Sequence, residues 1–173
     1  HDPMEIWENT KGVVRMVVEK AGINKGDIVG LGISNQRETA LVWDRETGLP
    51  VYDAIVWQCA RGAKICEGLS DHAEMIRERT GLRLSPYFSA AKIAWVLQNA
   101  PDLAGKKLCA GTVDSWLVFK MTKGAEFRCD YSNASRTQLF NLRTLSWDSD
   151  ICALFGVHPK TLPAVTDSDG LYG

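Results

Sequence analysis

The feature that most constrains the fold is a pair of short, continuous apolar runs. Residues 28–33 (Ile-Val-Gly-Leu-Gly-Ile) and 108–111 (Leu-Cys-Ala-Gly) contain no polar side chain. A strand with one solvent-exposed face alternates between apolar and polar residues, whereas a strand covered on both faces is apolar throughout. We therefore expect both runs to be strands buried inside the protein.

Helical patterns and further strand patterns surround these two runs. Asp2 and Pro3 open a segment in which apolar residues recur at helical spacing, and Gly22 is placed to end it. Further helices are expected near residues 61–69, 71–79, 89–99 and 148–155, and between Thr112 and Gly124. Strand patterns occupy 39–43 and 51–57, joined by a hairpin turn at 44–50, and also 127–131 and 138–142, which flank a polar turn at 132–136. Strands that alternate with helices predict an α/β fold, here with additional hairpins.

Length and charge exclude several classes of protein. A chain of 173 residues can form one domain with a sizeable core. The net charge is −1 and charges of both signs are mixed along the chain, so no nucleic-acid surface is predicted. No apolar run approaches the length of a membrane span and no signal-peptide pattern opens the chain, so we expect a cytoplasmic protein without membrane or nucleic-acid partners. The chain begins at His1 without an initiator Met, and we expect a piece of a longer protein.

Several familiar chemical motifs are missing. The five cysteines include no Cys-x-x-Cys pair, which favours reduced, buried thiols over a zinc site or a disulfide framework. The three histidines lack ligand spacing, so no metal site is predicted. Gly30-Leu31-Gly32 lacks the third glycine of a dinucleotide fingerprint, and neither a phosphate-binding loop nor a nucleophile elbow is present.

A polar cluster follows the first apolar run. Ser34, Asn35, Gln36, Arg37 and Glu38 come directly after residue 33. Ligands of open α/β sheets bind beyond the carboxyl ends of the strands. Arg37 offers only donors and Glu38 only acceptors, so the pair could bind a diol. From position alone, an Arg37–Glu38 ion pair that closes the strand is an equally good interpretation.

Two aromatic residues are further candidates for a binding site. Trp57 ends the strand pattern at 51–57, where it could form an apolar wall against the carbon side of a polyol, although a single Trp is more often part of the core. Tyr87 follows Pro86 just before a helical pattern, where its hydroxyl could face a cleft. The alternative is that Tyr87 packs against the first turn of that helix.

Four stretches together carry a family resemblance. Residues 30–61 (GLGISNQRETALVWDRETGLPVYDAIVWQCAR) closely resemble the corresponding stretch of glycerol kinases, and residues 87–99 (YFSAAKIAWVLQN) fit the first signature of the wider FGGY carbohydrate kinase family. Residues 111–124 (GTVDSWLVFKMTKG) and 130–148 (DYSNASRTQLFNLRTLSWD) resemble later parts of the same domain. The resemblance covers nearly the whole chain in unbroken order.

The resemblance implies a fold and a reaction. The family has two domains of the ribonuclease H-like, actin-like ATPase kind, with polyol and ATP bound between them. Residues 1–173 would then be an incomplete N-terminal, substrate-side domain with a mixed sheet and inserted hairpins, without the C-terminal ATP-binding domain. The implied reaction is ATP-dependent phosphorylation of glycerol to glycerol 3-phosphate. The alternatives are a kinase for another polyol or sugar, such as xylulose, gluconate or erythritol, and a non-catalytic polyol-binding module.

Carried over position by position, the resemblance also implies site residues. Arg37 and Glu38 would hydrogen-bond the substrate hydroxyls, Trp57 would pack against the carbon backbone, and Tyr87 would add a hydroxyl contact. No catalytic residue is expected in this chain, because the family's general base and its Asp-x-Gly-Thr phosphate-binding hairpin have no counterpart here. ATP and Mg²⁺ would serve the whole enzyme but not bind this chain, which we expect to be inactive alone. The sheet edge left by the missing early strands would favour a homo-oligomer.

Two short stretches depart from the glycerol kinase pattern. Glycerol kinases usually have Arg-Arg-Thr where this chain has Ala60-Arg61-Gly62, and Ser-Gly-Thr-Lys where it has residues 89–92, Ser-Ala-Ala-Lys. Neither departure changes a proposed hydroxyl ligand, but both leave room for a related polyol.

Overall fold

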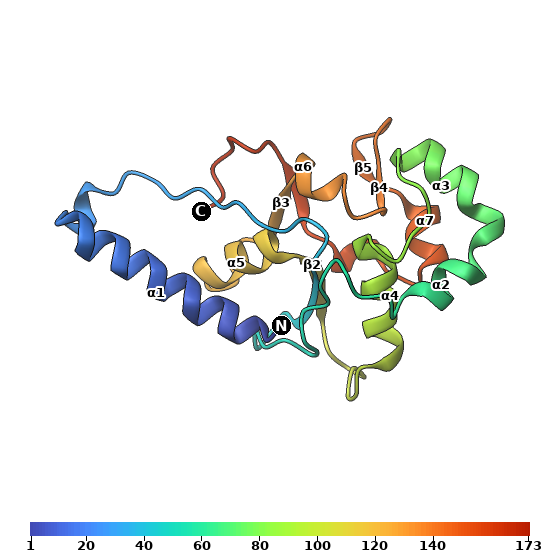
Figure 1. The fold of residues 1–173 in the computed structure, drawn as a ribbon, viewed down its shortest axis with the longest axis horizontal. Helices are drawn as coiled ribbons and strands as arrows, with labels where there is room; N and C mark the ends of the chain where they lie inside the picture. Colours follow the sequence, from blue (N-terminus) through green and yellow to red (C-terminus); the bar gives the residue numbers. More distant parts are fainter.

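An antiparallel pair of strands lies at the centre of the computed structural model, which describes all of residues 1–173 (Figure 1). Strand β1 (Ala40–Asp44) pairs with β2 (Leu108–Thr112), so that Ala40 lies opposite Thr112 and Asp44 opposite Leu108. All five residues of β1 are buried. The predicted strand at 108–111 is therefore confirmed, and 39–43 is confirmed to within one residue.

The two faces of β1 belong to two separate cores. Side chains alternate across a strand, so Ala40 and Val42 face one layer while Leu41 and Trp43 face the other. The first layer contains helix α4 (Ser89–Asn99), and the second contains helix α5 (Val113–Met121). In the second layer Trp43 makes edge-to-face contacts with three aromatic rings, those of Trp116, Phe119 and Phe127.

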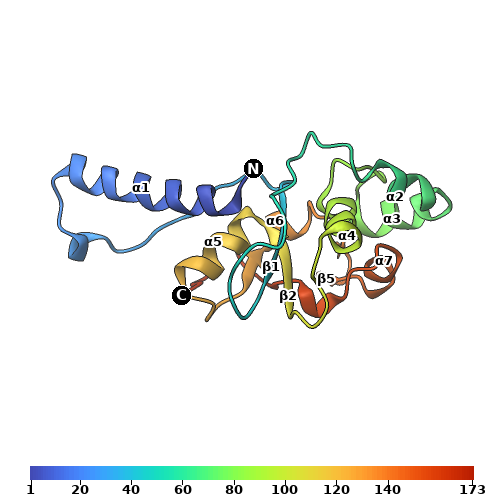
Figure 2. The same ribbon diagram turned by 90° about the horizontal axis from the view of Figure 1, so that it is seen from below.

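The remaining elements extend to either side of this centre. Figures 1 and 2 show helix α1 projecting from one end of the molecule, while α2, α3 and α7 lie at the other end. Two more two-stranded sheets form, β3 with β6 in parallel and β4 with β5 in antiparallel orientation. None of the helices combines the length and apolar character needed to cross a membrane. The bounds are α1 Pro3–Ala21, α2 Ala63–Gly68, α3 Ala73–Thr80, β3 Arg128–Asp130, α6 Tyr131–Ala134, β4 Phe140–Asn141, β5 Ser146–Trp147, α7 Ser149–Leu154 and β6 Ala164–Thr166, with 3-10 turns η1 Lys25–Asp27, η2 Ser70–His72 and η3 Pro159–Thr161.

The ends of α1 confirm the predicted caps, whereas Thr112 precedes α5 without a side-chain capping hydrogen bond and α5 ends at Met121, before Gly124. The Asp2 carboxylate accepts a hydrogen bond from the Met4 backbone N–H at 2.7 Å, and Pro3 occupies the first turn of α1. Gly22 ends α1 with a left-handed backbone (φ 64°), a conformation that glycine adopts without steric cost. Helix α4 has the bounds predicted from the sequence, Ser89–Asn99.

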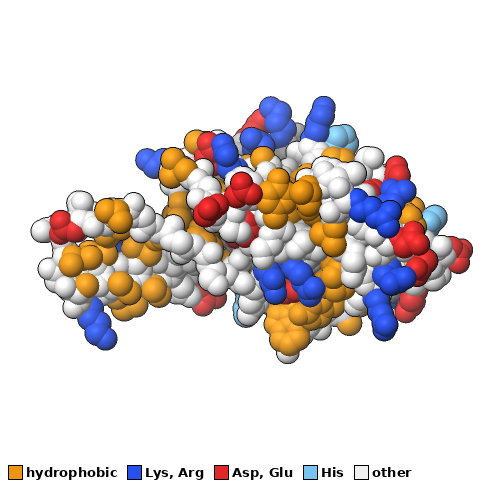
Figure 3. Space-filling model, turned by 90° about the horizontal axis from the view of Figure 1, so that it is seen from above, with side chains coloured by type: hydrophobic (Ala, Val, Ile, Leu, Met, Phe, Trp, Pro, Cys, Tyr) orange, Lys and Arg blue, Asp and Glu red, His pale blue; other side chains and the backbone are white.

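The prediction of a buried strand at 28–33 is wrong. This segment is extended but irregular, Val29 and Leu31 are exposed, and no backbone N–H from Val29 to Glu38 donates to a backbone carbonyl. An apolar run becomes a strand only where a neighbouring backbone supplies hydrogen bonds, and no part of residues 1–173 lies beside it in that way. Figure 3 shows the result as apolar side chains gathered on the arm made of α1 and the segment that returns from it.

Other strand predictions are only partly correct. Residues 51–57 form no strand, although isolated bridges join Pro50 to Trp43 and Ile55 to Ala40. The chain does reverse at 44–50, where the Asp44 N–H donates to the Leu49 carbonyl at 2.9 Å. The segments predicted at 127–131 and 138–142 shorten to β3 and β4, and the polar turn between them forms the single helical turn α6. Pairing extends over three residues between β3 and β6 and over two between β4 and β5.

The first turn of α2 lies very close to α4. A Cβ added to Gly62 would lie 2.8 Å from the Cβ of Ala91 and 3.1 Å from its carbonyl oxygen. Contacts below 3.0 Å force something to shift, and Ala91 offers no flexible side chain that could move. Gly62 therefore sets how closely α2 approaches α4.

We predict that Gly62→Ala lowers the free energy of unfolding by about 1–3 kcal/mol, the usual cost of overpacking. Gly68→Ala is the matched control within α2, because a Cβ there meets no atom within 4 Å. It should raise the free energy of unfolding by about 0.4–1 kcal/mol through the unfolded state. Urea unfolding of the two variants measures both effects, and equal stabilities would contradict the packing argument.

Candidate functional site

Glu38 lies at the entrance to β1, two residues before the strand begins. It is buried, and its Oε1 accepts a hydrogen bond from Nε of Arg136 at 2.9 Å across 98 residues of sequence. The Arg136 guanidinium also lies over the ring of Phe88, 5.1 Å from its centroid. A carboxylate held in this way presents its other oxygen as a fixed acceptor.

Tyr87 and Trp57 lie beside one another near Glu38. Their ring centroids are 5.9 Å apart at an interplanar angle of 67°. The backbone carbonyls of Glu38 and Tyr87 both accept hydrogen bonds from Nζ of Lys92, so the two segments meet at one atom. Trp57 is 40% exposed and Tyr87 36% exposed, so both aromatic rings are open to a ligand and neither belongs to the core. The structure thus brings together three of the four residues singled out in the sequence.

Arg37 is adjacent to this group in sequence but has no partner within the chain. It is exposed and makes no hydrogen bond or ion pair. The alternative interpretation, an Arg37–Glu38 ion pair that closes the strand, is wrong because Arg136 occupies that role. The donors of Arg37 therefore remain free for a ligand.

The polar cluster is positioned differently from the expectation. It was expected at the carboxyl end of a strand at 28–33, whereas Glu38 instead precedes the amino end of β1. Side-chain contacts hold the turn: Thr39 Oγ1 donates to Gln36 Oε1 at 3.0 Å, and Asn35 Nδ2 donates to Asp114 Oδ1 at 3.2 Å. The turn is thereby tied to the first turn of α5.

Asp114 is the most perturbed carboxyl group at this anchor. Burial raises its pKa to about 6, although hydrogen bonds from Thr112 Oγ1 and from backbone N–H groups act in the opposite direction. The side chain is buried at the start of α5, beneath the turn that carries Arg37 and Glu38. The protonation state of Asp114 is therefore coupled, through its contact with Asn35, to the position of this turn.

Arg136 was missed as a site residue by sequence reasoning. It lies in the polar stretch Ser132–Arg136, which was interpreted only as a turn between strands. Arg136 is a basic residue of a stretch, 130–148, that resembles the kinase family, but nothing in that resemblance indicated Glu38 as its partner. Their contact depends on the tertiary fold.

Two hollows lie away from the four predicted residues. One of about 470 Å³ lies between α1, residues 31–34 and α5, and one of about 420 Å³ lies near Arg45, Lys120 and Lys123. No group of three or more His, Cys, Asp or Glu side chains is arranged to hold a metal ion. The candidate site consists of the buried Glu38 and the exposed rings of Trp57 and Tyr87, beside the exposed Arg37.

Comparison with known proteins identifies the family. The whole chain, residues 1–173, matches the N-terminal domain of the FGGY family of carbohydrate kinases. The chain belongs to this family. The FGGY resemblance found in the sequence is thereby confirmed.

Relatives within the FGGY family include curated and structurally solved enzymes. Glycerol kinase from Fusobacterium nucleatum is 48% identical over 180 residues, and glycerol kinase 2 from Thermotoga maritima is 48% identical over 179 residues. In both cases the alignment covers all of this chain but only 36% of the relative, so the chain spans about a third of their length. The crystal structure of Plasmodium falciparum glycerol kinase with ADP has a TM-score of 0.86 and 36% identity, covering 95% of this chain and 34% of that one.

The structural comparison also decides the fold class. A xylulose kinase from Brucella ovis, only 22% identical, still superimposes with a TM-score of 0.85 over 96% of this chain. At that identity the likeness concerns the fold alone. The predicted α/β class, with the ribonuclease H-like, actin-like fold of FGGY kinases, is confirmed.

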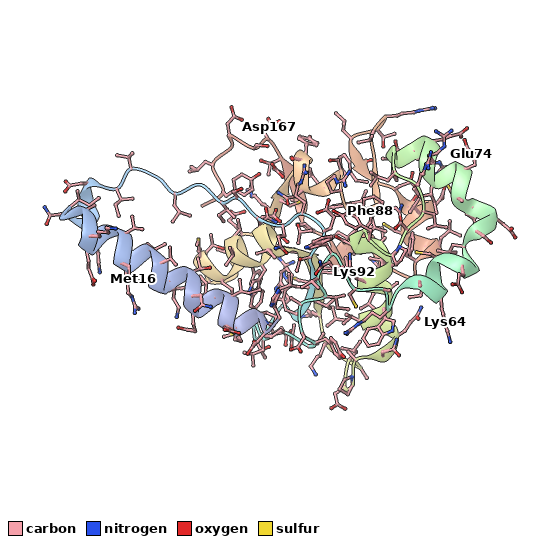
Figure 4. The ribbon with its side chains drawn as sticks, in the orientation of Figure 1. Met16, Lys64, Glu74, Phe88, Lys92 and Asp167 are labelled. Atoms are coloured by element: carbon pink, nitrogen blue, oxygen red, sulfur yellow. The ribbon has the colours of Figure 1, made fainter.

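We predict that Asp114→Asn removes a decrease in the free energy of unfolding that Asp114 contributes as pH rises from about 4 to about 6. Because the folded-state pKa is about 6 and the ordinary value 3.8, the folded chain binds more protons between these values, and its free energy of unfolding falls as pH rises from about 4 to about 6. The variant should remove a change on the order of 2–3 kcal/mol from this range. Asp167→Asn, at an exposed side chain without hydrogen bonds, is the control (Figure 4).

Urea unfolding at a series of pH values measures this effect. The parent chain and Asp167→Asn should share one slope, whereas the free energy of unfolding of Asp114→Asn should decrease less, or increase more, as pH rises from about 4 to about 6. Parallel curves for all three proteins would show that Asp114 ionises normally in the folded state.

Proposed function

We propose that the longer protein containing these residues is a glycerol kinase, which transfers the γ-phosphoryl group of ATP to glycerol and forms glycerol 3-phosphate. The observation that carries this proposal is that the chain has a higher sequence identity to a glycerol kinase than to other kinases of the same fold. The Plasmodium falciparum glycerol kinase structure is 36% identical to this chain, whereas the xylulose and gluconate kinase structures are 18–22% identical. Identities of 45–50% with bacterial glycerol kinases support the same conclusion.

Residues 1–173 would supply part of the glycerol site. Glu38 would accept a hydrogen bond from one hydroxyl, and Arg37 would donate to the same or the neighbouring hydroxyl. The fixed Arg136–Glu38 contact supports this role because a preorganised acceptor loses little freedom when a ligand binds. The exposed rings of Trp57 and Tyr87 would cover the carbon side of the polyol.

These residues would act by holding and orienting the acceptor hydroxyl. Phosphoryl transfer depends mainly on alignment of that hydroxyl with the γ-phosphate and on compensation of the phosphate charge. No group of three or more His, Cys, Asp or Glu side chains is gathered in this chain, so nothing here assigns a metal-ligand set to residues 1–173. Under this proposal ATP and Mg²⁺ are bound by other parts of the longer protein, and the Plasmodium falciparum glycerol kinase structure, which contains ADP, supports the use of an adenine nucleotide.

A kinase for a related polyol is the second candidate. The departure at 60–62 favours it, because these residues follow Trp57 closely and Ala60 and Gly62 have smaller side chains than the Arg and Thr that glycerol kinases usually have there. Smaller side chains directly after Trp57 could admit a longer polyol.

We predict that the full-length protein phosphorylates glycerol with a higher kcat/KM than xylulose, gluconate or erythritol. ADP release at saturating ATP, measured with each acceptor in turn, gives the comparison. A higher kcat/KM for erythritol would favour the related-polyol reading, and absence of turnover with every acceptor would contradict kinase activity.

We predict that Arg37→Ala in the full-length protein raises the KM for glycerol about tenfold or more, equivalent to ~1.4 kcal/mol. A hydrogen bond from a charged group to a substrate hydroxyl contributes roughly 1.5–3 kcal/mol. Arg143→Ala, at another exposed arginine far along the chain, is the matched control. An unchanged KM for Arg37→Ala would remove Arg37 from the site.

A further inference from the structure

Lys92 is a fully buried cation beneath the candidate site. Its side chain lies in helix α4 with 0% exposure, in the interior next to Phe88 (Figure 4). Nζ donates to three backbone carbonyls: Glu38 at 3.0 Å, Phe88 at 3.3 Å and Tyr87. An ammonium group has three donors, so its hydrogen-bonding capacity is used completely.

No carboxylate forms an ion pair with this ammonium. The carboxylate of Glu38, the only acidic side chain nearby, is bound to Arg136 instead. A buried charge without an ionic partner is costly, and an aliphatic side chain could fill the same volume. The energetic cost indicates that the three carbonyl contacts perform a task that packing alone would not.

The contacts themselves show what that task could be. Two of the three carbonyls belong to Tyr87 and Phe88 at the start of α4, and the third belongs to Glu38, which is 54 residues away in sequence. Glu38 carries the proposed hydroxyl acceptor, and Tyr87 forms part of the proposed aromatic wall. One ammonium group therefore determines the spacing between the two sides of the site.

We propose that Lys92 is a positioning residue for polyol binding, whose ammonium group fixes the backbones of Glu38 and Tyr87 relative to one another. This inference rests on the proposed function, because it assigns Lys92 to the same site. Lys92 does not touch the polyol in this scheme. Loss of the ammonium group would make the distance between the Glu38 carboxylate and the Tyr87 ring larger or more variable. Polyol affinity would therefore fall, while ATP affinity would not.

The charge of Lys92 makes the arrangement sensitive to pH. Burial lowers its pKa to about 8, although Glu38, Cys59 and Cys66 favour the charged form. The Tyr87 ring, 5.8 Å from Nζ, also faces the ammonium. Below about pH 7 all three contacts are present, and above the lowered pKa the neutral amine has lost one donor and its charge. Polyol affinity should therefore decrease as pH rises through about 8.

The contribution of Lys92 to the free energy of unfolding should change in the opposite direction to polyol affinity between about pH 8 and 10.5. The unfolded chain binds the Lys92 proton with the ordinary pKa of 10.5, so between about 8 and 10.5 it holds more protons at this group than the folded chain. The contribution of Lys92 to the free energy of unfolding thus increases with pH. A loss of polyol affinity above pH 8 would not result from unfolding driven by this group.

The test compares Lys92→Met with Lys64→Met in the full-length enzyme. Met matches the length of the Lys side chain without its charge, and Lys64 is an exposed lysine on α2 (Figure 4). For Lys92→Met we expect the KM for glycerol to rise about tenfold, the effect of one charged hydrogen-bonding group. The KM for ATP and the kcat at saturating glycerol should remain within about threefold, a shift of ~0.7 kcal/mol. Lys64→Met should match the parent enzyme.

The pH profile gives a second, independent measurement. The parent enzyme should show a rising KM for glycerol above about pH 8 with a steady KM for ATP, and Lys92→Met should lack that rise. The parent profile remains informative if Lys92→Met fails to fold. An enzyme that phosphorylates glycerol with a KM independent of pH through this range, or an unchanged KM in Lys92→Met, would overturn the role of Lys92 and leave the proposed function intact. A parent enzyme that does not phosphorylate any polyol would overturn both.

Discussion

The burial of β1 on both faces is the constraint on which the rest of the structure depends. A strand covered on two sides needs a packing layer on each, and the alternation of Ala40 and Val42 with Leu41 and Trp43 assigns those layers to different helices. Helix α4 packs on one face and α5 on the other. Because Glu38 immediately precedes β1, this arrangement brings its backbone to the start of α4, where Tyr87 and Phe88 lie.

Elements defined by local chemistry could be predicted from the sequence. The Asp2 cap, the Pro3 position and the left-handed Gly22 set both ends of α1, and α4 lies between Ser85-Pro86 and Pro101, which restrict it on both sides. The irregular conformation of residues 28–33 could not be predicted, because an apolar run contains no information about whether a partner backbone is present. The same reason accounts for the short β4 and the absent strand at 51–57, since strand length is decided by distant neighbours.

The candidate site, like the fold, could be predicted only in part from the sequence. Arg37, Glu38, Trp57 and Tyr87 were found through motifs that resemble a kinase family, and three of them meet in space. Their geometry depends on Arg136 and Lys92, to which the sequence assigned no role, although Lys92 lies in the stretch that fits the family signature. Arg136 acts on a carboxylate 98 residues away, and Lys92 acts on backbone carbonyls, which every residue has and no sequence pattern distinguishes.

The tight contact between Gly62 and Ala91 connects the two stretches in which this chain departs from the usual glycerol kinase pattern. Glycerol kinases usually have threonine at both positions, so the two departures form one steric unit and not two unrelated changes. Sequence drift at one position would constrain which residues the other can accept. A threonine introduced at position 62 from such a relative would be forced against Ala91, so chimeras would have to exchange the whole α2 and α4 segments, including the backbone spacing that accommodates a larger side chain at position 62.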